Sequence, residues 1–302
     1  MRNPFATATP GSPRRGDRRF DSPMVRHGLA RELSRRGACS RSQAEIAVRD
    51  GRVRVDGSIV RDISRPCDAR TRLEIDGVTV PSAPARLYLA LHKPRGLVTS
   101  TRQERGAASV YALLQDAGLP WVAPVGRLDK ASEGLLLLSN DSAWAAGITD
   151  PERHVRKIYR VQVRGVPDDS VLARMRGGVV DRGEHLAVAS VSLLQSGGRT
   201  AWLECVLVEG RNRHLRRLLA ALGFEVLRLM RIAIGPLVLG SLARGEWREL
   251  EPDEVRALAM AAGPRASRDS AKPPRASSQR SQSAATRGRV RSSVVPAPGL
   301  DR

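Results

Sequence analysis

The sequence predicts an α+β protein with two folded domains, a small helix–helix–sheet domain followed by a larger sheet-based domain. Three observations support this. Two helical segments precede short strands joined by Asp-Gly turns within residues 26–84. The Pro- and Ser-containing stretch at 81–84 then interrupts regular structure. Beyond it, short apolar runs of the length of buried strands recur up to about residue 263.

The composition narrows the classes of protein that this chain can belong to. It has 302 residues with 51 Lys and Arg against 31 Asp and Glu, a net charge of +20. Such an excess favours a polyanionic partner, most often RNA or DNA. The longest apolar runs are far shorter than the ~20 residues that span a bilayer, so we expect no membrane segment. The widely spaced Cys39, Cys67 and Cys205 fit neither a disulfide framework nor a zinc knuckle.

Both ends of the chain are basic and of low complexity. Residues 1–25 carry a net charge of +3 and residues 264–302 carry +7. Both are rich in Pro, Ser, Ala and Arg, so we expect disordered tails that contact nucleic acid without specificity. The N-terminal arginines precede no apolar stretch, so no secretory signal is predicted and a cytoplasmic protein is expected. The folded domains are then residues 26–84 and 85–263.

The elements of the first domain follow from local signals. Residues 27–37 have helical spacing and end at Gly37. Ser40 and Gln43 form a capping box that opens a second helix. Alternating residues with Asp-Gly turns then predict short strands at 52–55, 58–60 and 72–75.

Arginines cluster on these helices and on the first strand. They are either a solvated face or a surface that binds phosphate oxygens in bidentate fashion. The segments L-A-R-E-L-S-R-R-G, S-R-S-Q-A-E and G-R-V-R-V-D-G resemble the S4-like RNA-binding domain over about residues 26–80. The resemblance implies RNA binding. The candidate RNA-binding residues are Arg31, Arg35, Arg36, Arg41 and Arg52.

The second domain opens with an apolar strand at 87–92 and a turn at 93–96. Further along, the run of four leucines at 135–138 predicts a buried strand. The polar stretch 126–133 before it predicts a loop at the edge of a rigid sheet, a common place for catalytic side chains. Asp129 in this loop is either a turn residue or a catalytic carboxylate, and neighbouring Arg127 and Lys130 would favour its ionised form.

Five motifs of this domain occur together in the order of one known family. They are K-P-R-G at 93–96, V-G-R-L-D through G-L-L-L-L-S-N-D at 125–141, K-I-Y-R-V at 157–161, E-G-R-N-R-H-L-R-R at 209–217, and L-R-L-M-R with I-G-P-L at 227–237. They closely resemble the ribosomal RNA pseudouridine synthases of the RsuA type. The resemblance implies a mainly antiparallel mixed sheet and isomerisation of a specific uridine, a reaction that requires no cofactor or metal.

The resemblance also implies roles for individual residues. Asp129 is the catalytic carboxylate; whether it attacks the sugar, attacks the base or takes a sugar proton stays open. Tyr159 stacks on the flipped-out uracil, and Arg216, on a helix expected at 211–222, pairs with Asp129. Arg211, Arg213 and Arg217 are rivals for that pairing, because 213, 216 and 217 would share one side of the helix. The expected substrate-binding residues are Arg127, Lys157, Arg211, Arg213, Arg217 and Leu229.

The chain departs from the family pattern at three places: His92, Ser139 through Ser142, and His214. None of them involves Asp129, Tyr159 or Arg216, so the activity implied by the resemblance stands. We expect a monomer whose partner is ribosomal RNA or a ribosomal precursor particle, with large-subunit RNA favoured. The alternatives are a ribosome-assembly factor that binds RNA without chemistry, and a synthase acting on transfer RNA.

Overall fold

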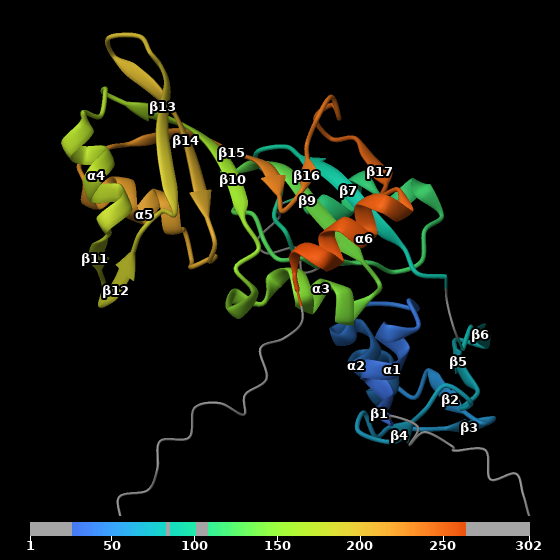
Figure 1. Cartoon of the computed structure of the whole chain (residues 1–302). Coiled ribbons are helices and arrows are strands. Elements are labelled where there is room, and N and C mark those ends of the chain that lie inside the picture. The colour runs from blue at the N-terminus through green and yellow to red at the C-terminus, as the bar shows by residue number, and fades with distance from the viewer. Residues whose placement is uncertain (1–25, 83–84, 101–107, 264–302) are drawn as a thin grey trace, which may run out of the picture. The chain divides into compact units, whose positions relative to one another are not determined.

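The computed structural model describes residues 26–82, 85–100 and 108–263, and it confirms the predicted α+β fold (Figure 1). The basic tails expected at 1–25 and 264–302 lie outside these residues, as does part of the predicted boundary at 81–84. In the described part of the chain, no helix has both the length and the apolar character needed to cross a membrane.

The first domain has two helices beside small sheets. Helix α1 (Leu29–Arg35) and helix α2 (Arg41–Arg49) pack on each other, and their apolar sides join one core with the strands. A four-stranded antiparallel sheet has the order β3-β2-β5-β6, and β1 pairs with β4. The strands are β1 (His27–Gly28), β2 (Val53–Val55), β3 (Ser58–Ile59), β4 (Pro66–Cys67), β5 (Leu73–Ile75) and β6 (Val78–Val80).

Local sequence signals explain these elements. The Ser40 side chain accepts from the Gln43 amide while the Gln43 side chain accepts from the Ser40 amide, which confirms the predicted capping box. Asp56 and Gly57 both have positive φ, at 50° and 86°, as a two-residue hairpin turn requires. Asp76 and Gly77 repeat this conformation between β5 and β6. The first helix is shorter than predicted, because 27–28 form a strand.

The second domain is built on a nine-stranded mixed sheet with the order β13-β14-β10-β15-β9-β7-β17, to which β8 and β16 add at β9 and β15. Every pairing in it is antiparallel except that of β15 with β9. Its strands are β7 (Tyr88–Lys93), β8 (Ala123–Val125), β9 (Glu133–Ser139), β10 (Lys157–Arg164), β13 (Ser190–Ser196), β14 (Thr200–Leu207), β15 (Val226–Ile234), β16 (Leu237–Val238) and β17 (Trp247–Glu249).

Helices cover the two halves of this sheet and give each half its own core. Helices α4 (Asp169–Gly177) and α5 (His214–Ala221), with the hairpin β11 (Val179–Asp181) and β12 (Glu184–Leu186), form one core with β10, β13, β14 and β15. Helices α3 (Ser142–Thr149) and α6 (Pro252–Ala261) form another with β9 (Figure 1). On the other face of β7 and β9, a third core includes the short helix η1 (Val110–Leu113). Short helices η2 (Gln115–Ala117) and η3 (Pro151–Arg153) complete the domain.

The halves join where β15 runs parallel to β9, and a glycine permits the contact. Gly134 has φ +106°, and a Cβ atom there would lie 2.2 Å from the Arg231 carbonyl oxygen. No larger residue fits this approach without moving one of the strands. The sheet is therefore continuous from one half to the other at the start of β9, directly after the loop that carries Asp129.

Candidate active site

The loop that carries Asp129 runs from Gly126 to Ser132, between β8 and β9. Six consecutive backbone carbonyls of this loop, at residues 127 to 132, each accept a hydrogen bond from a group outside the loop. Buried backbone groups are costly when unpaired. Hydrogen bonds to six consecutive carbonyls fix the path of the loop backbone without helix or sheet structure.

Three of these donors come from the last residue of β7 and the segment that follows it. Thr99 Oγ1 donates to the Leu128 carbonyl at 2.8 Å, and the Gly96 amide donates to the Lys130 carbonyl at 2.8 Å. The third is the side chain of Lys93, which is fully buried. The K-P-R-G motif and Thr99 thus hold one side of the loop.

Lys93 binds the loop at two points. Its Nζ lies 3.2 Å from the Asp129 carbonyl, 2.8 Å from the Ser132 carbonyl and 3.0 Å from the Pro94 carbonyl. Burial lowers the pKa of Lys93 to about 8, and the charge of Arg231 lowers it further. The negative charges of Asp129 and Glu133 act in the opposite direction. Three carbonyl acceptors match the three protons of an ammonium group, so the charged form completes the clamp.

Arginines from α5 and β15 hold the other side of the loop. Arg216 Nη2 donates to the Ala131 carbonyl at 3.0 Å, and Arg231 Nη1 donates to the Arg127 carbonyl at 3.5 Å. Burial lowers the pKa of Arg216, as does Arg213, while the Asp129 charge acts in the opposite direction. Among the ion pairs of the described residues none joins Asp129 to an arginine, so the predicted pairing with Arg216 is replaced by a contact with the loop backbone.

A cavity of about 430 Å³ opens beside this loop. Asp129 and Tyr159 both line it, so the structure brings together two of the three predicted catalytic residues. Lys157 and Tyr159 share one face of β10, as residues two apart in a strand must. The predicted substrate-binding residues that also line the cavity are Arg127, Lys157, Arg211, Arg213 and Leu229.

The arginine-rich motif differs from its prediction in two respects. Helix α5 begins at His214 rather than 211, because Arg213 adopts a left-handed conformation with φ +49° at the N-cap. Arg213 therefore does not share a helix face with Arg216 and Arg217. Arg217 lies outside the cavity lining and instead forms ion pairs with Asp181 and Glu184 of the β11–β12 hairpin, so its expected substrate contact is corrected to a structural one.

His214 also has a structural contact. It is buried, and its Nε2 lies 2.9 Å from the Ala187 carbonyl oxygen. Its Nδ1 lies 4.0 Å from Glu209 Oε1. Burial lowers the pKa of His214, which favours the neutral ring. The histidine thus connects the start of α5 to the segment before β13.

Two residues that contact the Asp129 loop were not among the site residues predicted from the sequence. Lys93 belongs to the recognised K-P-R-G motif, and Arg231 ends the recognised L-R-L-M-R segment. Both could have been found as charged residues of apolar strands: Lys93 at the end of one and Arg231 within another. Such a residue must find partners when the strand is buried, and here the partners are the loop carbonyls.

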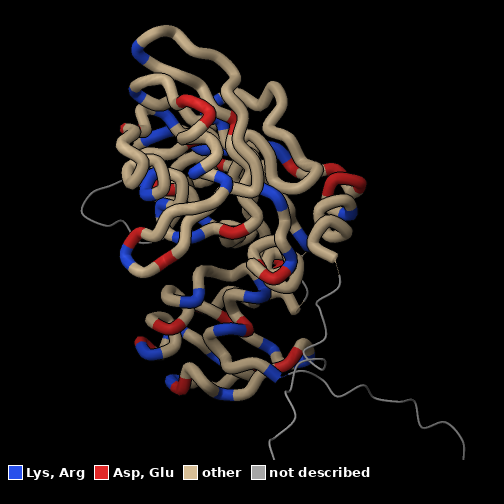
Figure 2. Tube along the Cα trace, turned by 60° about the vertical axis from the view of Figure 1, so that its left-hand side comes forward, with Lys and Arg blue, Asp and Glu red and all other residues tan. Residues whose placement is uncertain are grey.

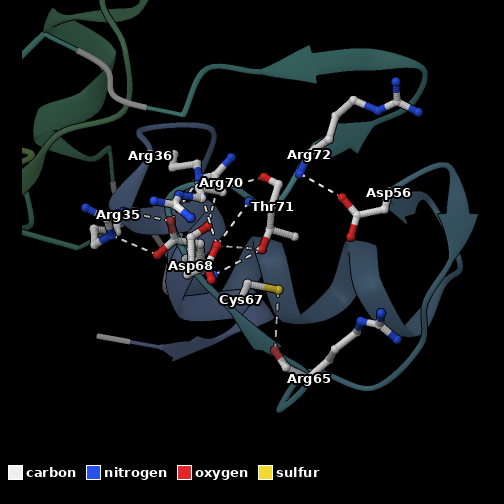
Figure 3. Close-up of polar contacts among 10 residues, drawn as sticks. Arg35, Arg36, Asp56, Arg65, Cys67, Asp68, Arg70, Thr71 and Arg72 are labelled. Carbon is white, nitrogen blue, oxygen red and sulfur yellow. Dashed lines mark hydrogen bonds and ion pairs between the residues drawn. The ribbon is translucent and has the colours of Figure 1, made fainter. Parts of the chain in front are cut away.

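The predicted RNA-binding arginines of the first domain fall into two groups. Arg36 is only 2% exposed, so it does not lie on the surface. Its Nε donates to Glu32 Oε1 at 2.8 Å, and its Nη2 donates to the carbonyls of Asp68 and Thr71 (Figure 3). Burial would raise the pKa of Glu32, but the hydrogen bonds and charges of Arg35 and Arg36 outweigh it and lower that pKa. Arg36 is therefore corrected to a core residue.

The other four predicted arginines are exposed. Arg35 and Arg52 are already held by carboxylates, Arg35 by Glu32 and Arg52 by Asp76. Arg41 lies 3.4 Å from Glu45, with 69% of its side chain exposed. Along the described trace, Lys and Arg positions are interspersed with Asp and Glu positions (Figure 2).

The sequence of this chain is similar to those of known proteins. A family described as RNA pseudouridylate synthase matches residues 87–221, and the S4 domain family matches residues 28–73. An uncharacterized RNA pseudouridine synthase of Aquifex aeolicus is 37% identical over 243 residues, which cover 80% of this chain and 96% of that protein. The chain belongs to the RNA pseudouridine synthase family.

Two further relatives agree. The ribosomal large subunit pseudouridine synthase B of Bacillus subtilis is 31% identical over 76% of this chain and 94% of its own length. A crystal structure of a pseudouridylate synthase has a TM-score of 0.53 and 30% identity, covering 78% of this chain and 99% of its own. The protein is thus an isomerase that acts on RNA, with an N-terminal S4 domain.

Proposed function

We propose that this synthase converts a specific uridine of ribosomal RNA, in the large subunit by preference, to pseudouridine through Asp129. The observation that carries the proposal is the clamped loop, which presents Asp129 to the cavity that Tyr159 also lines. A preorganised charged group at a reacting centre does not have to reorganise during the reaction. The name of the Bacillus subtilis relative supports the large-subunit target.

The chemistry matches these residues. The bond between uracil N1 and sugar C1′ breaks, the uracil turns, and a bond forms between C5 and C1′; the C5 proton leaves and N1 gains one. No electrons or groups are transferred overall, so the reaction itself needs no cofactor. Asp129 acts on the nucleotide after it leaves its stack, a step that costs a few kcal/mol.

The surrounding side chains have distinct roles in this proposal. Tyr159 offers an aromatic face to the uracil and a hydroxyl for proton transfer. Leu229, which is 6% exposed and lines the cavity, forms an apolar wall. Arg216 acts as a positioning residue, because it binds the loop carbonyl two residues after Asp129.

The test combines one substitution with mapping of pseudouridine. In total RNA from a strain that lacks the gene, one ribosomal RNA position is expected to lose its pseudouridine, and the wild-type gene restores it. Asp129→Asn lowers the rate of isomerisation by at least ~10³-fold and leaves RNA affinity within a few-fold. Asp253→Asn, at a side chain 88% exposed on α6, is the matched control and retains activity.

Each other outcome has a definite meaning. An Asp129→Asn variant that isomerises uridine at the wild-type rate overturns the catalytic role. A deletion strain that loses no pseudouridine indicates an RNA-binding assembly factor. A loss that maps to transfer RNA replaces the ribosomal target.

A further inference from the structure

The guanidinium of Arg231 is buried but only partly bonded. The residue is 5% exposed and lines the cavity. Its Nε donates to the Leu135 carbonyl at 2.8 Å and its Nη1 to the Arg127 carbonyl at 3.5 Å. Its Nη2 is buried and has no hydrogen-bond partner among the described residues. A buried donor without a protein partner is uncommon in native proteins and is completed by an ordered water or by a ligand.

A second cation lies in the same cavity. Lys157 also lines it. Within the described residues its Nζ has one hydrogen-bond acceptor, the Ile148 carbonyl at 3.5 Å, the outer limit of a hydrogen bond. Burial lowers the pKa of Lys157 to about 8, and the charge of Arg231 lowers it further. The two cations therefore line the same cavity.

Protein carboxylates do not neutralise this pair. None of the ion pairs found in the described ranges includes Lys157 or Arg231, although many other arginines there are paired. Asp129 is the one carboxylate among the cavity-lining residues that the structure describes, and its charge acts on Lys93 and Arg216. The cavity therefore holds an uncompensated positive charge whose cost falls when an anion enters.

We propose that Arg231 and Lys157 form a subsite for a phosphodiester group of the bound RNA. The free Nη2 of Arg231 and the ammonium of Lys157 donate to its non-bridging oxygens, as these groups do in phosphate recognition. A uracil carbonyl would satisfy one donor but would leave both positive charges uncompensated. This inference rests on the proposed function, because that function places RNA in the cavity.

The position of the subsite fits a nucleotide that Asp129 acts upon. Tyr159 and Arg231 are direct partners in the pairing of β10 with β15. The residue proposed to stack the base and the residue proposed to bind the phosphate therefore occupy neighbouring positions of the sheet. Phosphate contacts fix position rather than sequence, so this subsite seats the flipped nucleotide whatever its neighbours are.

The first experiment measures binding of small probes to the full chain, without turnover. Uridine, uridine 3′-monophosphate, uridine 5′-monophosphate and inorganic phosphate are titrated by NMR against the wild type, Lys157→Met and Arg231→Met. One of the two monophosphates is expected to bind the wild type at least ~10-fold more tightly than uridine. Lys157→Met removes this preference and leaves the affinity for uridine within about two-fold. The control variant is Arg256→Met, since Arg256 lies on α6 and pairs with Asp253. It is expected to keep the preference for the monophosphate.

The results separate this inference from the proposed function. A wild type that binds uridine and both monophosphates equally overturns the subsite, as does a Lys157→Met variant that keeps the preference. If Arg231→Met does not fold, Lys157→Met alone decides. The phosphate preference can persist in Asp129→Asn even if the deletion strain loses pseudouridine at no RNA position. That combination supports the subsite and rejects only the proposed reaction.

The second experiment identifies the source of the phosphate. A ribosomal RNA fragment binds with an affinity that falls with salt, and each phosphate contact contributes about 0.7 to the slope of the logarithmic plot for single strands. Lys157→Met is expected to reduce this slope by about that amount, and inorganic phosphate is expected to compete with the fragment. Phosphate that binds tightly without displacing RNA would assign the subsite to a free anion and overturn the proposal.

Discussion

Two buried arginines, one in each domain, are almost equally removed from solvent but bonded differently. Arg36 of the first domain, 2% exposed, is neutralised by Glu32 and binds two carbonyls. Arg231 of the second domain, 5% exposed, binds two carbonyls, pairs with no carboxylate, and keeps one nitrogen without a partner in the described structure. Burial alone therefore does not distinguish an arginine that stabilises the fold from one that can bind a ligand. The hydrogen-bond and ion-pair partners of the guanidinium distinguish them.

The largest effect in this comparison is expected at Arg36. Arg36→Met leaves Glu32, which is 0% exposed, with Arg35 as its remaining partner, and it leaves two carbonyls without their donor. Removal of one member of a buried ion pair costs about 3–5 kcal/mol, so local unfolding of residues 26–82 becomes easier by about that amount. Hydrogen exchange of the α1 and α2 amides measures it.

Arg41 supplies the control for that measurement. Its side chain is 69% exposed and lies 3.4 Å from Glu45 on the same helix. Arg41→Met should change the protection of α1 and α2 by about 0.5 kcal/mol or less. Equal effects of the two substitutions would refute the distinction between a core and a surface arginine in this domain.

Local sequence signals predicted much of the fold. The capping box at Ser40 and Gln43 and the turn at Asp56-Gly57 depend on residues a few positions apart, so the sequence contains all the required information. The strand around the four leucines was also predicted, although it begins earlier, at Glu133. Family motifs placed Asp129 and Tyr159 in one cavity, which composition and periodicity alone could not do.

The differences arise from long-range contacts. Arg36 resembled its surface neighbours in sequence, but carbonyls more than thirty residues away hold it in the core. The helix at 211–222 was predicted too long, because the left-handed Arg213 depends on the packing of the segment before α5 and not on helix propensity. Arg217 pairs with Asp181 and does not line the cavity, and no local sequence pattern links these two residues.

A smaller loss of stability is expected at Arg231. Arg231→Met removes hydrogen bonds to two carbonyls, at a cost of about 1–3 kcal/mol, but it also removes the repulsion with Lys157. The net loss is then about 1–2 kcal/mol. All four tryptophans lie in residues 85–263, so urea unfolding followed by tryptophan fluorescence reports this domain. A loss as large as that of Arg36→Met would mean that Arg231 is a structural residue first.

The last effect concerns Lys93 and is visible only as a dependence on pH. Glu32 has a lowered pKa because arginines stabilise its charged form, whereas Lys93 has a pKa lowered to about 8 because burial disfavours its charge. Unfolded lysine titrates near ~10.4, so between about pH 8 and 10 the unfolded chain binds more protons and the free energy of unfolding rises with pH. Relative to Lys93→Met, the wild type should gain roughly 1–2 kcal/mol from about pH 7 to 9.5 in the fluorescence measurement. A difference that stays constant over this range would mean that the three carbonyls keep Lys93 charged, and the buried lysine would then be a permanent cation like Arg36.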